Sequence, residues 1–143
     1  PVRREEFTAP RGRGAQLNGR RIRVSQRASL DGALLGTGIP FKGHGDERLP
    51  AYAEVLAGLA GQCAGIRRAG AASLDLAYVA AGRLDAFWEY GLSVWDMAAG
   101  VLLIREAGGL VADLDGSDAY LESGNIVCGN PKCFKAVLQA LRR

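Results

Sequence analysis

Hydrophobic and polar positions alternate along the first third of the chain and take helical spacing after about residue 50. In the first third, Asn18-Gly19 separates two alternating stretches, and because both residues tolerate positive φ the pair predicts a two-residue hairpin turn. A further short strand is expected from about Ala33 to Thr37. The next stretch, KGHGDERLP, is polar and is predicted to be a loop.

Two helices and a strand are predicted in the middle of the chain. Apolar side chains recur at i, i+3 and i+4 in a helix that begins near Ala51 and in a second helix from about Ala72 to Ala81, where Gly82 is a suitable stop. The segment LDAFWEY then alternates as a strand does, with two sets of side chains on opposite faces. These sets are Leu84, Ala86 and Trp88 on one face and Asp85, Phe87 and Glu89 on the other.

A third helix, from Asp96 to about Ala107, is apolar nearly all round, so it is expected to be buried between two layers. Two short strands, LVADLDG and NIVCGN, follow it. Asn130 and Pro131 then begin a last helix, as its cap and its first-turn proline. This order of strands and helices predicts a layered α/β fold in one domain over residues 1–143, with no linker and no repeat of fixed period.

Composition and charge limit the classes of protein to which the chain can belong. With 143 residues, of which 48% are hydrophobic and 23% charged, it is globular and large enough to bury a core. A net charge of +3 suits an anionic ligand but is too small to indicate nucleic-acid binding. The arginines near the start have no aromatic residues between them to stack bases, so they are predicted to form a solvated face. Nucleic acid is therefore not an expected partner.

The cysteines and the apolar runs bear on the cellular compartment. Cys63, Cys128 and Cys133 lack metal-ligand spacing, and the single histidine, His44, does not complete a zinc site with them. Free cysteines are typical of a reducing cytoplasm, which is the expected location. No apolar run is long enough to cross a membrane and no signal peptide is recognised, so no membrane partner is expected.

Three features could carry chemistry, although each also has an ordinary structural interpretation. Asp96, taken alone, is expected to be the N-cap of the third helix, but its charge lies where an apolar helix begins, and a cation is one natural partner. One aspartate does not make a magnesium site, because Mg²⁺ takes several oxygen ligands. Glu89 is either a solvated acid at a strand end or an acceptor for ligand hydroxyl groups. Gly70 is either a plain turn or part of a loop that offers N–H groups to a sugar, cyclitol or phosphate.

A long stretch resembles the C-terminal signature region of the inositol monophosphatase family: RRAGAASLDLAYVAAGRLDAFWEYGLSVWDMAAGVLLIREAGGLVADLDG. The core of the likeness is Trp95-Asp96 followed by small residues, and then the segment EAGG. It continues upstream through FTAPRGRGAQLNGRRIRVS and downstream through GNIVCGNP, so it covers essentially the whole chain. The segments GIPF and IRRAG are similar to the bacterial branch of the family.

The resemblance implies a magnesium-dependent phosphomonoesterase that hydrolyses inositol 1-phosphate, with a layered αβαβα fold, usually a homodimer and inhibited by lithium. By position, Asp96 matches a metal-binding aspartate at the substrate, which makes it an expected Mg²⁺ ligand and not only a cap. Glu89 matches the acid that accepts a hydrogen bond from an inositol hydroxyl group. Gly70, Ala71 and Ala72 match the loop that holds the inositol ring.

The chain also departs from the family pattern. The other metal-binding acids of the family belong to a Gly-Glu-Glu stretch and an Asp-Pro-x-Asp-Gly-Thr stretch in an N-terminal half, and neither occurs here. The chain, which begins at Pro1, is therefore expected to be a C-terminal portion with no catalytic residue of its own and no phosphatase activity alone. Two alternatives remain open. One is a phosphatase of the same superfamily that acts on histidinol phosphate, a bisphosphate nucleotide or fructose bisphosphate, and the other is a non-catalytic protein that binds RNA or a transcription partner.

Overall fold

The computed structural model describes residues 5–10, 12, 14–38 and 49–142. In chain order the elements are β1 (Phe7–Thr8), β2 (Gln16–Leu17), β3 (Arg20–Arg21), β4 (Leu34–Thr37), α1 (Leu49–Ala60), β5 (Gly65–Arg67), α2 (Ala72–Ala80), β6 (Ala86–Glu89), α3 (Val94–Glu106), β7 (Leu110–Ala112), α4 (Tyr120–Ser123), β8 (Ile126–Gly129) and α5 (Pro131–Leu141). His44 and most of the predicted polar loop lie outside the described residues, and the last two residues of that loop, Leu49 and Pro50, begin α1 instead.

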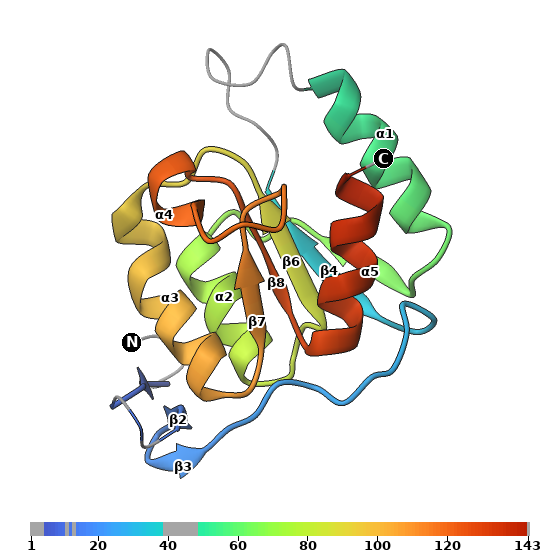
Figure 1. Ribbon diagram of the computed structural model, residues 1–143. Coiled ribbons are helices and arrows are strands. Elements are labelled where there is room, and N and C mark those ends of the chain that lie inside the picture. Colours follow the sequence, from blue (N-terminus) through green and yellow to red (C-terminus); the bar gives the residue numbers. More distant parts are fainter. Residues whose placement is uncertain (1–4, 11, 13, 39–48, 143) are drawn as a thin grey trace.

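The larger sheet has five strands in the order β5-β4-β6-β8-β7. Strand β4 runs parallel to β5 and β6, whereas β8 runs antiparallel to β6 and β7. Helices α2 and α3 lie side by side on one face of this sheet, and α1 and α5 lie on the other face (Figure 1). Because helices cover both faces, the predicted layered α/β arrangement is confirmed.

A smaller sheet near the start of the chain has the order β1-β2-β3 and is antiparallel throughout. Asn18 and Gly19 connect β2 to β3 with φ values of 50° and 81°, so the predicted hairpin turn is confirmed. The Asn18 side chain also accepts a hydrogen bond from the backbone N–H of Glu6 at 2.8 Å. This contact holds the hairpin turn against Glu6, the residue that precedes β1.

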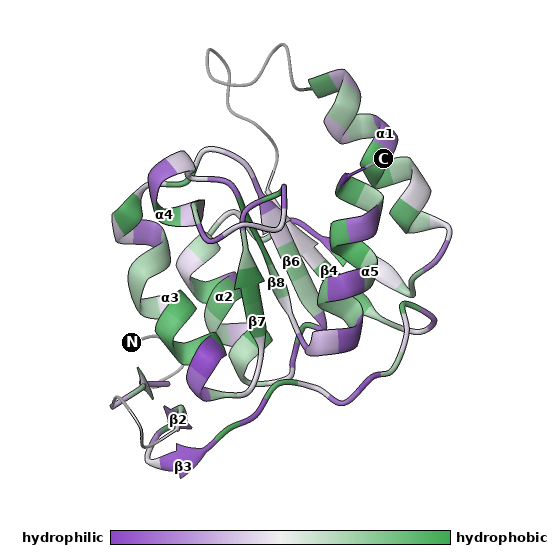
Figure 2. Ribbon diagram, in the orientation of Figure 1, coloured by the Kyte–Doolittle hydropathy of each residue, from purple (hydrophilic) through white to green (hydrophobic). Residues whose placement is uncertain are grey.

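Two apolar cores lie on opposite faces of the five-stranded sheet. Phe87 of β6 belongs to the core shared with α2 and α3, and Trp88 to the core shared with α1 and α5. Figure 2 shows the strands of this sheet largely in hydrophobic colours. Because β6 is covered on both faces, all four of its residues are buried, including the acidic Glu89. The alternation predicted for this strand is correct. Its two sets of side chains enter two different apolar cores, and neither set faces solvent.

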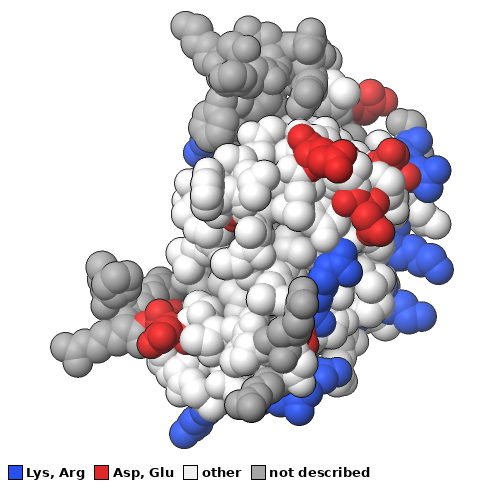
Figure 3. Space-filling model, turned by 60° about the vertical axis from the view of Figure 1, so that its left-hand side comes forward, with Lys and Arg blue, Asp and Glu red and all other residues white. Residues whose placement is uncertain are grey.

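Helix α3 differs from its prediction in its start and in its burial. It begins at Val94 and not at Asp96, and it buries one face, including Met97 and Ile104, against α2 and the sheet. Its opposite face is exposed, with Trp95 at 92% of its full accessibility and Leu102 at 38%. The expected burial of α3 between two layers is therefore wrong. Among the described residues, no element packs against its outer face, although the side chains on that face are apolar. Figure 3 shows that the surface on this side carries few charges over a broad area.

Two short elements were not expected from the sequence. Strand β5 has three residues, too few for an alternating pattern, and α4 is a single turn. The other helices agree with prediction to within about two residues. In α5 the side chain of Asn130 accepts a hydrogen bond from the N–H of Cys133 at 2.8 Å, so the predicted cap is confirmed. Cys63, Cys128 and Cys133 are all free thiols, as expected.

Candidate functional site

Four segments that are distant in sequence meet at one edge of the five-stranded sheet. Strands β4 and β6 are parallel, so their carboxyl ends reach the same edge, where the β5–α2 loop and the start of α3 also lie. These segments enclose a cavity of about 220 Å³. Its lining residues are Gly38, Arg68, Gly70, Ala71, Ala72, Ser73, Glu89, Leu92 and Asp96. All five residues singled out from the sequence therefore line the same cavity.

Glu89 is the last residue of β6 and is only 8% exposed. The interpretation of this residue as a solvated strand-end acid is wrong, because β4 and β8 flank the strand and helices cover both of its faces. Burial first, and then the nearby carboxylates of Asp75 and Asp96, raise the pKa of Glu89 from 4.5 to about 7, while Arg68 opposes the change. The carboxyl group is thus close to the boundary between its neutral and charged forms near neutral pH.

Asp96 lies in the first turn of α3 and is the third helical residue, so its expected role as N-cap is wrong. Ser93 is the cap, and the two residues form a reciprocal capping box. The Ser93 hydroxyl donates to Asp96 Oδ2 at 2.8 Å, and the Ser93 N–H approaches the same oxygen at 3.4 Å. The capping box therefore orients the carboxylate through Oδ2 and not through Oδ1, and Asp96 also lines the cavity.

The loop before α2 combines positive φ with an uncapped helix start. Gly70 has φ of +80°, a conformation that favours glycine, and nothing lies within 4 Å of where its Cβ would be. Ala71 takes the N-cap position of α2 with an extended backbone and has no side-chain oxygen with which to cap it. The first N–H groups of α2 are consequently suited to bind oxygen atoms of a ligand.

Sequence reasoning did not single out Gly38, Arg68, Ser73 and Leu92, which line this cavity, or Asp75, which lies beside it. Asp75 is 3% exposed, and burial raises its pKa from 3.8 to about 6 while the charge of Arg67 opposes the rise. A charged residue next to Leu76 in an otherwise apolar helix was a signal that could have found Asp75. The sequence carries no comparable signal for Gly38, whose role depends on a contact across the sheet.

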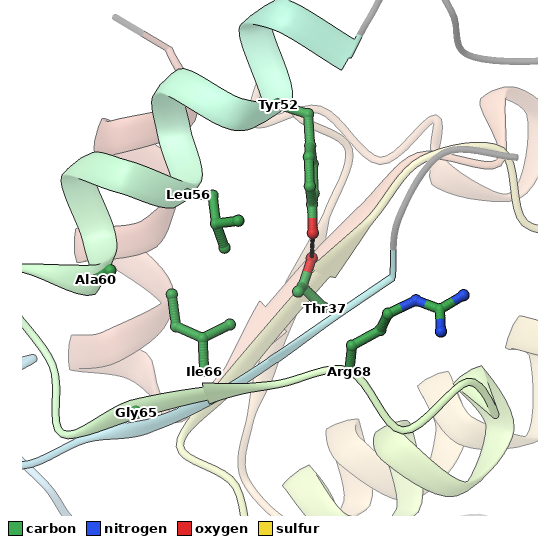
Figure 4. A pocket seen from close by; sticks show the side chains of 7 residues that line it. All are labelled: Thr37, Tyr52, Leu56, Ala60, Gly65, Ile66 and Arg68. Carbon is green, nitrogen blue, oxygen red and sulfur yellow. Dashed lines mark hydrogen bonds between the residues drawn. The ribbon is translucent and has the colours of Figure 1, made fainter.

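A second cavity, of about 390 Å³, lies between α1 and β5. Figure 4 shows its lining, in which Leu56 and Ile66 face one another and the hydroxyl groups of Tyr52 and Thr37 are 3.2 Å apart. Arg68 lines both cavities, and its guanidinium group points away from Leu56 and Ile66. This second cavity is mainly apolar, so the cavity that holds Glu89 and Asp96 is better suited to a polar ligand.

Magnesium needs more oxygen ligands than the described segments bring together. Across residues 5–10, 12, 14–38 and 49–142, no group of three His, Cys, Asp or Glu side chains could hold a metal ion. Asp96 fits as one ligand, because its Oδ1 remains outside the capping box. The described residues therefore fit one side of a magnesium site.

The helices of the same residues are too short or too polar to cross a membrane.

Comparisons with known proteins extend over the whole chain. The protein named Nus factor SuhB of Pseudomonas aeruginosa is 68% identical over 142 residues, which are 99% of this chain and 52% of that protein. The protein named inositol-1-monophosphatase of Rhizobium meliloti is 53% identical over 143 residues, which are 100% of this chain and 53% of that protein. The chain thus spans about half the length of the curated relatives it matches.

Solved structures and a family model agree with these relatives. The crystal structure of the extragenic suppressor protein suhB from Bartonella henselae superposes with a TM-score of 0.95 at 45% identity, over 100% of this chain and 54% of that one. The model of the inositol monophosphatase family matches residues 1–143. As the sequence resemblance indicated, the chain belongs to the inositol monophosphatase family.

Proposed function

We propose that the chain is the substrate-binding part of a magnesium-dependent phosphomonoesterase that hydrolyses inositol 1-phosphate to inositol and phosphate. The observation that carries the proposal is the convergence of Glu89, Asp96 and the Gly70–Ala72 loop on one cavity from three separate segments. Membership of a family of phosphatases supports the reaction class. Homodimer formation and inhibition by lithium are further properties that the family relationship leads us to expect.

Each cavity residue has a distinct role in the proposed function. Asp96 would be a Mg²⁺ ligand, and the capping box keeps its carboxylate in place. Bound magnesium would neutralise phosphate charge and activate the attacking water. Glu89 binds a ring hydroxyl group, and the backbone N–H groups at Gly70–Ala72 bind further oxygens of the ring. The guanidinium group of Arg68 contributes a positive charge at the rim, which suits a phosphate ester.

The chain alone is proposed to be inactive. Asp96 is the one metal ligand that the resemblance assigns to it, and among the described residues no cluster of three potential ligands completes a site. An enzyme of this kind needs several oxygen ligands around each Mg²⁺. Activity is consequently expected from the full-length gene product, with the remaining acids supplied outside these residues.

A substrate panel on the full-length gene product tests the proposal. We expect inositol 1-phosphate to have a higher kcat/KM than histidinol phosphate, a bisphosphate nucleotide or fructose bisphosphate. Glu89→Gln should lower kcat/KM for inositol 1-phosphate by about tenfold, because the amide oxygen is a weaker hydrogen-bond acceptor than a carboxylate by about 1 kcal/mol or more. It should leave the hydrolysis of 4-nitrophenyl phosphate, which has no ring hydroxyl groups, nearly unchanged. A better substrate among the other three esters would replace inositol 1-phosphate in the proposal.

A second candidate function is a non-catalytic role with an RNA or protein partner. It is favoured by the relatives that carry the name Nus factor SuhB, and the exposed Arg20 and Arg21 of β3 offer a basic surface. Binding assays with RNA and with transcription proteins, made on wild type and on Asp96→Asn, distinguish the two functions. Binding that survives Asp96→Asn, in a protein without hydrolytic activity, would favour the non-catalytic role.

A further inference from the structure

Gly38 follows β4 and lies directly beneath the side chain of Glu89. A Cβ atom placed on Gly38 would be 1.6 Å from Glu89 Oε1, 2.2 Å from Cδ and 2.8 Å from Cγ. Unbonded atoms do not approach this closely, so the Glu89 side chain occupies the space that any other residue at position 38 would fill. Gly38 is not among the glycines with positive φ, which means that space and not backbone conformation explains the glycine here.

The backbone on either side of this contact has little freedom to relax. Thr37, which precedes Gly38, pairs with Trp88, which precedes Glu89, in the parallel ladder of β4 and β6. Glu89 is also paired with Ile126 of β8 on its other side. A side chain at position 38 would therefore move the Glu89 carboxyl group and not the strands that carry it. Both Gly38 and Glu89 line the cavity, so this movement would change the surface that meets a ligand.

We propose that Gly38 is a positioning residue, which sets the place of the Glu89 carboxyl group and with it the recognition of the hydroxyl-bearing part of the substrate. This inference rests on the proposed function, in which Glu89 binds a ring hydroxyl group. In this proposal Gly38 acts through Glu89 and not on the phosphate group. Its substitution should affect esters of polyhydroxylated alcohols and leave esters without such hydroxyl groups alone.

Kinetics on the full-length gene product test the effect on recognition. Gly38→Ala should raise KM for inositol 1-phosphate by about tenfold or more, as expected when a hydrogen bond to a charged group is misplaced. Hydrolysis of 4-nitrophenyl phosphate should change less than twofold. In a Glu89→Ala background, Gly38→Ala should have no further effect on either substrate. An equal loss for both substrates, or a full extra loss in that background, would overturn the inference.

Thermal unfolding of the same four proteins tests the contact without relying on activity. Gly38→Ala should lower the Tm in the wild-type background and not in the Glu89→Ala background, because Glu89→Ala removes the three atoms that the new Cβ would meet. Gly58→Ala is a matched control, since nothing lies within 4 Å of its Cβ position in α1. Equal lowering in both backgrounds would show that Gly38 does not act through Glu89. If the coupling is present but no phosphate ester is hydrolysed, the proposed function fails and the positioning contact stands.

Discussion

Asp75 and Glu89 keep their carboxyl groups in buried positions where ionisation is disfavoured. Burial raises the pKa of each, that of Asp75 to about 6 and that of Glu89 to about 7. Because the folded state holds the Asp75 proton more tightly than the unfolded state does, Asp75 stabilises the fold fully below about pH 4. This contribution is lost as the pH rises through about 6.

We therefore predict that Asp75→Asn makes the protein more stable at pH 7 and has little effect near pH 4. The free energy of unfolding at pH 7 should rise by up to about 3 kcal/mol, since each pKa unit corresponds to about 1.4 kcal/mol. Denaturant unfolding in the presence of a chelator measures this difference without a contribution from bound metal. The exposed Asp31→Asn is the control and should change little at either pH. A gain for Asp75→Asn that is equal at both pH values would contradict the assignment.

At the scale of single elements, the start of α3 shows what the sequence contained and what pattern reasoning missed. Ser93 and Asp96 have the Ser-x-x-acid spacing of a capping box, so the sequence already indicated a start at Val94. The apolar run by itself predicts a start at Asp96, two residues too late. The hairpin at Asn18-Gly19 and the cap at Asn130 were predictable because local chemistry decides them. The contact between Gly38 and Glu89 was not, because it joins residues that are distant in sequence.

Removing the N-cap of α3 should lower the stability of the protein and raise its magnesium requirement. Ser93→Ala is expected to lower the free energy of unfolding by about 1 kcal/mol, the usual effect of losing an N-cap. It should also raise the Mg²⁺ concentration needed for half-maximal activity by about tenfold, because the Asp96 carboxylate loses the 2.8 Å hydrogen bond that orients it. Ser93→Thr keeps a hydroxyl group and should preserve both properties. Lower stability with an unchanged magnesium requirement would mean that the cap does not orient Asp96.

At the scale of the whole molecule, the exposed apolar face of α3 indicates an interface. Trp95 and Val94 are exposed on this face at 92% and 49%, and large uncharged surfaces of this kind usually mark interfaces. The chain spans about half the length of the relatives from Pseudomonas aeruginosa and Rhizobium meliloti, which it matches over nearly its entire sequence. The layered α/β fold could be predicted from the order of elements, whereas the one-sided burial of α3 could not, because burial depends on what packs against the helix.

The 143-residue chain and the full-length gene product should accordingly differ in activity. We predict that the 143-residue chain hydrolyses no inositol 1-phosphate at any Mg²⁺ concentration, because Asp96 alone does not hold the ion in a catalytic arrangement. A phosphate-release assay on both proteins, with circular dichroism to establish folding, makes the comparison. Turnover by the folded 143-residue chain would show that its own residues complete a metal site.

The role of Asp96 as a magnesium ligand at a phosphate ester is tested most directly by Asp96→Asn in the full-length gene product. Asparagine retains an oxygen for the capping box, so the Tm should remain close to that of the wild type. Mutating a residue that only supports a metal ligand typically lowers metal affinity or activity by about ten- to a hundredfold. Losing the ligand itself should therefore lower kcat/KM for inositol 1-phosphate by at least about tenfold and weaken the dependence of the rate on Mg²⁺. Hydrolysis at the wild-type rate, with the same magnesium dependence, would contradict the assignment.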